Sequence, residues 1–289
     1  MTTTGSSAFH PHRNDSDSEA EVGADADADP MAEVLDLDAE VLRTYLSELT
    51  SWLGGLTDRE PRRIVDLGSG TGTGAVALAR RFARAEVTAA DLSPRMLRRL
   101  SEKASALGLA DRVHGVEVDL DEDWPTSDTI DLIWAASSLH HLADPARVLA
   151  RAFDALRPGG LLAVTEMDFF PRFLPDDVGV GRPGLEARVH AALNKGPAVD
   201  WTDHLVRAGF VLEAERPFVI DLPAPLPAAA PRYAQASLRR LRSHLDGQLS
   251  TTDLAALDTV IDGEGRLGVL RRTDLTVRTT RITWAARRP

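Results

Sequence analysis

The glycine-rich stretch VDLGSGTGTG at residues 65–74 constrains the fold of this chain more than any other feature. An apolar, strand-like run at 64–67 carries one acid, Asp66, and leads through four alternating glycines into the helix-like pattern AVALARRF. Glycines let the backbone turn sharply at positive φ and let a ligand approach backbone N–H groups without an intervening Cβ. A strand, a glycine loop and a helix in this order predict a nucleotide-binding site.

Two glycine spacings fit this loop, and they predict different cofactors. A dinucleotide fold uses G-x-G-x-x-G, and the nearest fit here is Gly70, Gly72 and Ala75, which leaves Asp66 and Gly68 unused. The second spacing, acid-x-Gly-x-Gly-x-Gly, runs from Asp66 to Gly72 and uses every special residue. We favour the second spacing, which resembles motif I of the class I S-adenosylmethionine (SAM) methyltransferases.

The resemblance implies a role for each residue of the loop. In that family the loop runs past the methionine end of SAM, and the acid supports the loop or reaches the ammonium group of the cofactor through water. We therefore expect SAM to be bound by these residues of the motif: Asp66, Gly68, Ser69, Gly70 and Gly72.

Strand-like and helix-like patterns alternate after the loop, which predicts an α/β fold. Strands are expected at 63–67, 86–90, 113–118, 131–136 and 160–166, and helices at 73–84, 94–107 and 144–156. This alternation favours a parallel sheet with helices on both faces and a ligand at the carboxyl ends of the strands. The resemblance implies a Rossmann-like sheet of seven strands, in which an antiparallel edge hairpin follows five parallel strands.

The chain divides into four predicted parts. Residues 1–30 are acidic and of low complexity, and we expect them to be disordered. Residues 31–60 show helical spacing and form a predicted N-terminal cap, before a SAM-binding core at 61–168. Residues 169–289 are expected to contact the substrate and to supply the last two strands, with helices at 185–194 and 201–208 and a helical insertion at about 232–257.

The second predicted strand ends in VTAADLSP, where an acid precedes a helix start. Ser93 and Pro94 are a typical N-cap and first helical residue. A carboxylate at this strand end can accept both hydroxyls of an adenosine ribose, so Asp91 is the expected ribose ligand; the alternative is an acid that only starts the helix. Leu92 and Met96 are expected against the adenine or in the helix core.

The third predicted strand leads into VDLDEDWP, which holds a cluster of acids. In the family this position supplies an acid that accepts from the adenine amino group, and the next residue donates its backbone N–H to the ring. We assign these roles to Asp119 and Leu120, and we interpret Asp121, Glu122 and Asp123 as solvated loop charges.

The stretch IDLIWAASSLHHLADPARVLARAFDALRPGGLLAVTE extends the resemblance to the small-molecule branch of the family, over about residues 62–166. It implies that Ala135 and Ala136, with Ser137, line the methionine end of SAM, since small side chains leave room there. Residues 158–160 need only form a turn.

Two side chains are candidates for catalysis, His140 and Glu166. Imidazole titrates near neutrality and can take a proton from an attacking phenol, alcohol or amine. Asp168 competes equally with Glu166 for this role, and His141 is a weaker candidate than His140; either histidine could instead cap or pack against the following helix. Alignment alone contributes on the order of 7–11 kcal/mol in well-oriented reactions, so methyl transfer does not depend on finding a base.

The chain is acidic, with a formal net charge of −11, of which residues 1–30 contribute −6 through seven acids and one arginine. Nucleic-acid binders usually present a basic footprint, so we expect a small-molecule substrate and no nucleic acid. The chain lacks cysteine and any apolar run of the roughly 18–20 residues that span a membrane. We therefore expect a cytoplasmic protein without membrane contact or metal, either monomer or homodimer.

These features predict a SAM-dependent methyltransferase that acts by in-line displacement on a small organic molecule, with specialised metabolites as one class. Motif I concerns cofactor binding rather than methyl transfer, so two alternatives stay open. One is a SAM-binding enzyme that catalyses a cyclisation or rearrangement, and the other is a non-catalytic module that binds SAM or a partner. Arginines of the C-terminal part could bind an anionic substrate or pair with acids elsewhere: Arg239, Arg240, Arg242, Arg271 and Arg272.

Overall fold

The computed structural model describes residues 29–126, 128–193 and 199–289. The predicted disordered tail lies outside these ranges, apart from its last two residues, which begin the first helix, α1 (Pro30–Val41). The Asp29 side chain accepts the backbone N–H of Met31 at 2.9 Å. A carboxylate in this place satisfies an N–H that has no partner within the helix, so the helix starts one residue before the predicted cap.

Within the described ranges, seven strands form one sheet in the order β3-β2-β1-β4-β5-β7-β6. Strands β1 to β5 pair in parallel, and β7 is antiparallel to both β5 and β6. The predicted α/β class, with five parallel strands and an antiparallel edge hairpin, is confirmed. The strand bounds are β1 (Arg63–Leu67), β2 (Glu86–Asp91), β3 (Val113–Glu117), β4 (Ile130–Ala136), β5 (Leu156–Met167), β6 (Val211–Leu222) and β7 (Val277–Arg287).

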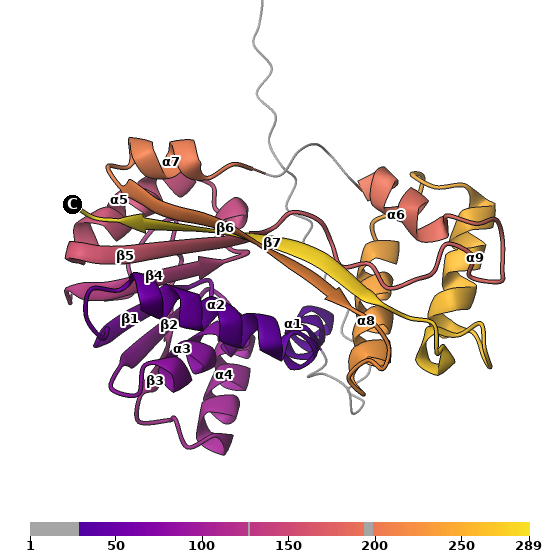
Figure 1. Cartoon of the computed structure of the whole chain (residues 1–289), viewed down its shortest axis with the longest axis horizontal. Coiled ribbons are helices and arrows are strands. Elements are labelled where there is room, and N and C mark those ends of the chain that lie inside the picture. The colour runs from indigo at the N-terminus through magenta and orange to yellow at the C-terminus, as the bar shows by residue number, and fades with distance from the viewer. Residues whose placement is uncertain (1–28, 127, 194–198) are drawn as a thin grey trace, which may run out of the picture.

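Helices cover both faces of the sheet (Figure 1). Along β4, Leu132 and Trp134 join one hydrophobic cluster, whereas Ile133 and Ala135 join the other, because side chains alternate across a strand. The first cluster includes residues of α2 (Arg43–Leu56), α3 (Thr73–Arg81) and α4 (Pro94–Ala106), and the second includes residues of α5 (Pro145–Ala155) and α7 (Thr202–Arg207). Burial on both faces explains why β4 is apolar at consecutive positions over 132–136.

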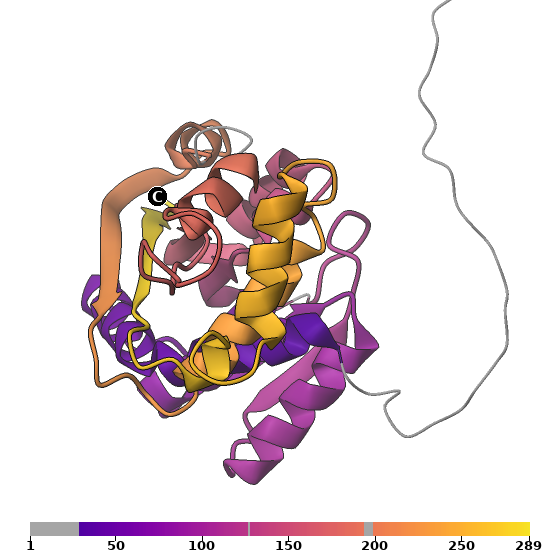
Figure 2. The same ribbon diagram turned by 90° about the vertical axis from the view of Figure 1, so that its right-hand side faces the viewer.

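A helical lobe lies beyond the carboxyl ends of the parallel strands (Figure 1, Figure 2). It consists of α6 (Leu185–Leu193), α8 (Ala230–Arg242), α9 (Thr251–Asp262) and the short turn η2 (Val269–Arg271). The hairpin joins this lobe to the sheet, because β7 pairs with β5 over 281–287 and continues over 277–280, where it pairs with β6 and where Arg278 also bridges Arg172. The predicted helical insertion at about 232–257 consists of two helices, α8 and α9.

The predicted turn at 158–160 belongs instead to the irregular start of β5. Gly159 has a φ of +76° and donates its N–H to the Arg288 carbonyl at 2.8 Å, and Arg288 donates back to Gly160 at 3.0 Å. Pairing with the end of the chain thus extends the strand four residues beyond the predicted start. Among the described residues, no helix is both long and apolar enough to cross a membrane.

Candidate functional site

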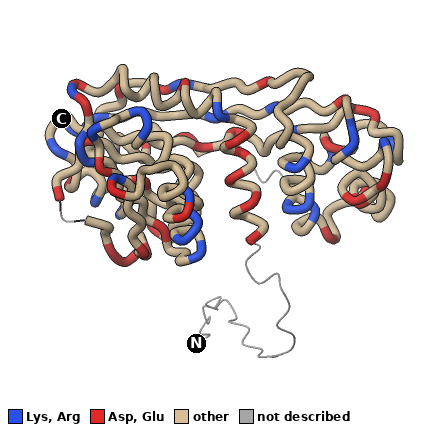
Figure 3. Tube along the Cα trace, turned by 90° about the horizontal axis from the view of Figure 1, so that it is seen from below, with Lys and Arg blue, Asp and Glu red and all other residues tan. Residues whose placement is uncertain are grey.

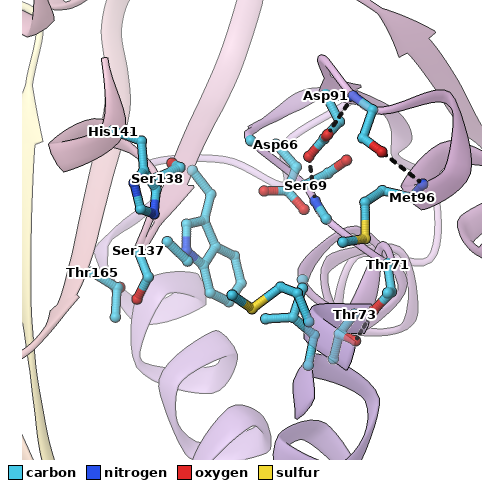
Figure 4. A pocket seen from close by; sticks show the side chains of 18 of the residues that line it. Asp66, Ser69, Thr71, Thr73, Asp91, Met96, Ser137, Ser138, His141 and Thr165 are labelled. Atoms are coloured by element: carbon cyan, nitrogen blue, oxygen red, sulfur yellow. Dashed lines mark hydrogen bonds between the residues drawn. The ribbon is translucent and has the colours of Figure 1, made fainter. Parts of the chain in front are cut away.

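A cavity of about 460 Å³ lies at the carboxyl ends of β1, β2 and β4 (Figure 4). The strand order reverses between β1 and β4, and ligands bind in open α/β sheets at such a point. Helix α1 forms the opposite wall through its apolar face. Ten of the twelve residues predicted to bind SAM line the cavity: Asp66, Gly68, Ser69, Gly70, Asp91, Leu92, Met96, Asp119, Leu120 and Ala136.

The glycine loop needs its glycines for two reasons. Gly68, Gly70 and Gly72 have φ values of +68°, +52° and +76°, a region that favours glycine. A Cβ on Gly68 would also lie 2.4 Å from the Ser138 Cβ. The backbone N–H groups of Gly68 and Ser69 donate to the Ala90 carbonyl at 2.8 and 2.9 Å, which fixes the loop against the end of β2.

Asp66 lies beneath this loop and is almost fully buried, with 3% of its surface exposed. Burial raises its pKa to about 7, a backbone N–H from Ala75 lowers it, and the nearby Asp91 raises it further. The Oδ2 atom of Asp66 and the Oγ atom of Ser69 are buried without a hydrogen-bond partner among the described residues. Unpaired buried polar atoms are costly, so a ligand that carries donors, such as the ammonium group of SAM, fits this wall of the cavity.

Asp91 holds the loop and remains able to accept further hydrogen bonds (Figure 4). Its Oδ2 accepts the Gly70 N–H at 2.7 Å and its Oδ1 accepts the Ser93 N–H at 2.8 Å. A carboxylate has about four acceptor sites, so two stay available for ribose hydroxyls. Beside it, Leu92 is 64% exposed and Met96 is 8% exposed, and both line the cavity.

Asp119 and Leu120 line the cavity next to Asp91, as the sequence predicts. The prediction for Asp121 differs from the structure: this acid also lines the cavity, and it accepts the N–H groups of Ala143 and Asp144 at 2.9 and 3.0 Å. Those two hydrogen bonds lower its pKa. Asp121 thus connects the segment after β3 to the start of α5 through these two hydrogen bonds.

The structure places Gly72 and Ala135 outside the cavity wall. Gly72 precedes α3, where a Cβ would lie 2.4 Å from the Cγ of Leu100, so its role is in packing. Ala135 is fully buried on the face of the sheet that packs against α5. Its neighbour Ala136 borders the cavity, because the side chains of consecutive strand residues point to opposite faces.

Ser137 follows β4 at the cavity with a φ of +53°, the one positive value at a non-glycine residue in the described ranges. Such a conformation costs on the order of 1–3 kcal/mol and clusters at functional sites. The Ser137 N–H donates to the Thr165 carbonyl at 2.8 Å. Ser138 and His141, which follow this strained turn, also line the cavity (Figure 4).

The two predicted catalytic residues pair with each other: His140 Nδ1 and Glu166 Oε2 are 2.9 Å apart. This hydrogen bond raises the pKa of His140. Neither side chain borders the cavity, whereas His141 does, from the same turn, η1 (Leu139–His141). Burial and the neighbouring His140, whose ring centroid is 4.0 Å away, lower the pKa of His141. Of the two imidazoles, the one that borders the cavity, His141, therefore loses its proton more readily.

A polar cluster that sequence reasoning missed closes the far end of the cavity. Asp38 of α1 accepts the Tyr233 hydroxyl of α8 at 2.5 Å and pairs with Arg281 of β7. Desolvation works against the charged Arg281, but Asp38 and the neighbouring tyrosines hold its pKa above the usual range. An arginine within the apolar alternation of a strand is the signal that could have revealed this cluster.

Helix α1 carries acids that pair with both the sheet domain and the helical lobe. These acids are the red segments next to the grey trace in Figure 3. Besides the Asp38 cluster, Glu33 pairs with Arg232 of α8 at 2.8 Å and Asp36 pairs with Lys103 of α4 at 2.6 Å. The helix that covers the cavity is therefore attached to the sheet domain on one side and to the helical lobe on the other.

This strand order, with its antiparallel seventh strand, its glycine loop after β1 and its acids after β2 and β3, defines the class I SAM-dependent methyltransferase fold. Residues 64–160 match the family model described as a methyltransferase domain. The chain therefore carries a class I SAM-dependent methyltransferase domain, and the prediction that its cofactor is SAM is confirmed.

Relatives match this region of the chain, and a solved structure shares its fold. A malonyl-(acyl-carrier protein) O-methyltransferase of Laribacter hongkongensis is 35% identical over 167 residues, which cover 54% of each chain. A 27-O-demethylrifamycin SV methyltransferase of Amycolatopsis mediterranei is 29% identical over 190 residues, which cover 62% of this chain and 65% of that relative. The crystal structure of the 4+2 cyclase SpnF shares the fold, with a TM-score of 0.50, 21% identity and coverage of 84% and 81% of the two chains. The chain spans about half the length of the first curated relatives that it matches.

Proposed function

We propose that this protein is a SAM-dependent methyltransferase that acts on a small organic molecule by in-line displacement. The proposal is carried by the cavity wall, where the buried Oδ2 of Asp66 and Oγ of Ser69 have no hydrogen-bond partner within the described ranges and lie beside the acceptor sites of Asp91. When bound, SAM supplies a methyl group already activated on a sulfonium. The protein then has to bind SAM and the acceptor, align the two and exclude water.

The cofactor-binding roles follow from where acceptors and donors face the cavity. Asp66 and Ser69 receive the polar end of the methionine moiety, and Asp91 accepts the ribose hydroxyls. Asp119 accepts from the adenine amino group, and Leu120 donates its N–H to the ring. We propose that residues 61–168 hold SAM in this way, while the cap at 31–60 and the segments at 169–289 contact the acceptor.

We assign the role of proton acceptor to His141 rather than to His140. His141 borders the cavity, and its lowered pKa leaves it neutral near neutrality and able to take a proton from the attacking group. The hydrogen bond that His140 makes to the Glu166 carboxylate holds His140 in place, and His140 packs against the His141 ring. Helix α1 and its C-cap residue, Leu42, cover the opposite side, and Met31, Leu35 and Leu42 exclude water there.

The size of the cavity supports a small acceptor. About 460 Å³ lies within the range of small-molecule sites, and a bound SAM would occupy much of it. One relative is named for a malonyl group on a carrier protein and another for a rifamycin derivative. We propose a small specialised metabolite as the acceptor.

Two measurements test the proposal. Calorimetric titration with SAM and S-adenosylhomocysteine should show saturable binding, and mass spectrometry of reactions with candidate acceptors should show S-adenosylhomocysteine formed in equal amount to methylated product. Absence of binding would overturn the proposal. Product without S-adenosylhomocysteine would favour a cyclisation or rearrangement, and binding without any product across acceptors would favour a non-catalytic module.

A further inference from the structure

A second, smaller cavity of about 90 Å³ adjoins the first. The two cavities share Met31, Leu35, Asp38, Ser137 and Arg281, so the smaller one adjoins the first at the Asp38 cluster and at Ser137, which is expected at the methionine end of SAM. Its remaining walls come from the end of β5, the connection that follows β5, and α8. This is the position at which an acceptor would extend away from the cofactor.

Arg240 of α8 faces this cavity without an anionic partner. Its guanidinium makes no hydrogen bond or ion pair with any described residue, and it lies 5.9 Å from the Phe170 ring centroid. Other arginines of the C-terminal part do have acid partners: Arg239 with Asp262, Arg242 with Asp246 and Asp258, and Arg272 with Asp274. Burial lowers the pKa of Arg240, as expected for a partly desolvated charge without compensation.

A hydroxyl group lies on the same face of α8. Ser237 is three residues before Arg240, a spacing that places both on one side of a helix, and it lines the same cavity with 7% of its surface exposed. Its Oγ is buried and has no hydrogen-bond partner among the described residues. Two polar groups with unused hydrogen-bonding capacity therefore converge on one small space.

The acids near this cavity already have cationic or hydroxyl partners. Asp38 pairs with Arg281 and Tyr233, and Glu166 pairs with His140. Arg240 therefore leaves one positive charge uncompensated. A single guanidinium beside a hydroxyl suits a planar carboxylate, whereas a phosphate monoester carries about −1.5 to −2 charges and calls for more than one cation.

We propose that Arg240, with the Ser237 hydroxyl, binds a carboxylate group of the methyl acceptor. The inference rests on the proposed function and specifies its substrate class. A carboxylate held by a guanidinium has its lone pairs engaged and is a weak nucleophile, so this group positions the acceptor and the methyl group goes to another atom of the same molecule.

The test uses acetate as the probe and the full chain saturated with S-adenosylhomocysteine. The arginine Nε–H signals are followed by NMR during titration with acetate, with neutral acetamide and with inorganic phosphate. The signal of Arg240, assigned by its loss in R240Q, should shift and saturate with acetate but not with acetamide. R240Q should weaken acetate binding at least about tenfold, the equivalent of one charge-assisted hydrogen bond, and S237A should weaken it less.

R239Q is the matched control, because it removes the same charge from the next residue of α8, where Arg239 pairs with Asp262 away from the cavity. It should leave acetate binding unchanged. The inference is overturned if acetate does not saturate below about 0.1 M, if R240Q binds acetate like the wild type, or if phosphate binds more tightly than acetate. A protein that binds S-adenosylhomocysteine but fails these tests refutes the carboxylate site alone, whereas failure to bind S-adenosylhomocysteine refutes the proposed function.

Discussion

The two halves of the cavity are built in different ways. The cofactor half consists of short segments at the ends of β1, β2 and β3, fixed by local hydrogen bonds such as that from Gly70 to Asp91. The acceptor half consists of side chains far apart in the sequence, and Asp38 meets Arg281 across 243 positions. A change in the first half should therefore act on cofactor affinity, and a change in the second should act on stability or on turnover.

The largest effect is expected in the cofactor half, from Asp91→Ala. The change removes the acceptor of two loop N–H groups and the proposed ribose ligand. Two hydrogen bonds to a charged group account for about 3–6 kcal/mol, so the affinity for S-adenosylhomocysteine should fall about a thousandfold in calorimetric titration. Glu122→Ala, in the exposed loop beyond the cavity, is the control. Equal loss in both variants would contradict the assignment.

In the acceptor half, Asp38→Ala should lower the free energy of unfolding by about 3 kcal/mol, because it leaves the Arg281 charge largely buried without its partner. Urea unfolding monitored by circular dichroism measures the change. The exposed pair of Glu33 and Arg232 provides the comparison, and Glu33→Ala should cost less than about 1 kcal/mol. Similar costs for both variants would show that the Asp38 cluster is not the main attachment of α1.

At the boundary between the halves, His141→Asn should reduce kcat by about a hundredfold for an acceptor that loses a proton, with cofactor affinity unchanged. His140→Asn should reduce kcat less. In the wild type, kcat should fall as the pH drops below the pKa of His141, which lies below the usual imidazole value. A larger loss of kcat in His140→Asn would show that His140, the candidate from the sequence, is the base.

The helical lobe should respond to pH through His190 of α6, which is buried and whose pKa is lowered to about 4, mainly by burial. Between pH 6.5 and 4 the unfolded chain binds a proton that the folded chain does not, so this residue makes the protein less stable as pH falls. At pH 5 the contribution is about 1–2 kcal/mol.

Glu186, whose pKa burial raises to about 7, acts in the opposite sense. The effect of His190 is therefore measured as the difference in unfolding free energy between wild type and His190→Gln, at pH 7.5 and at pH 5. The difference should shift in favour of the variant at pH 5. A pH-independent difference would show that His190 is not held neutral in the folded protein.

The smallest effect is expected at the rim of the cofactor half. Leu92 is 64% exposed beside Asp91, so Leu92→Ala should leave the unfolding free energy unchanged. Loss of its contact with the adenine should weaken S-adenosylhomocysteine binding by a few-fold, about 0.5–1 kcal/mol. A stability loss with unchanged affinity would place Leu92 in the helix core instead.

The difference between the cofactor half and the acceptor half also explains how much of the site could be predicted from the sequence. The ends of β1, the N-cap at Ser93 and the position of Asp91 follow from patterns contained in ten to twenty consecutive residues. Tyr233 and Asp38 lie 195 positions apart, and no periodicity in one sequence relates them. Between neighbours, as for His140 and His141, the winding of one short turn decides which ring faces the cavity. A single sequence does not specify that rotation.

The place of β7 between β5 and β6 has a consequence for biosynthesis. Every other strand of the sheet is translated earlier, yet one edge of β5 and the inner edge of β6 stay unpaired until residues 277–287 leave the ribosome. Arg281, which neutralises Asp38, arrives with the same strand. The growing chain can assemble the parallel part of its sheet early. Its unpaired strand edges can meanwhile pair with other chains, which leads to misassembly. Closure of the cavity therefore waits until β7 has been translated.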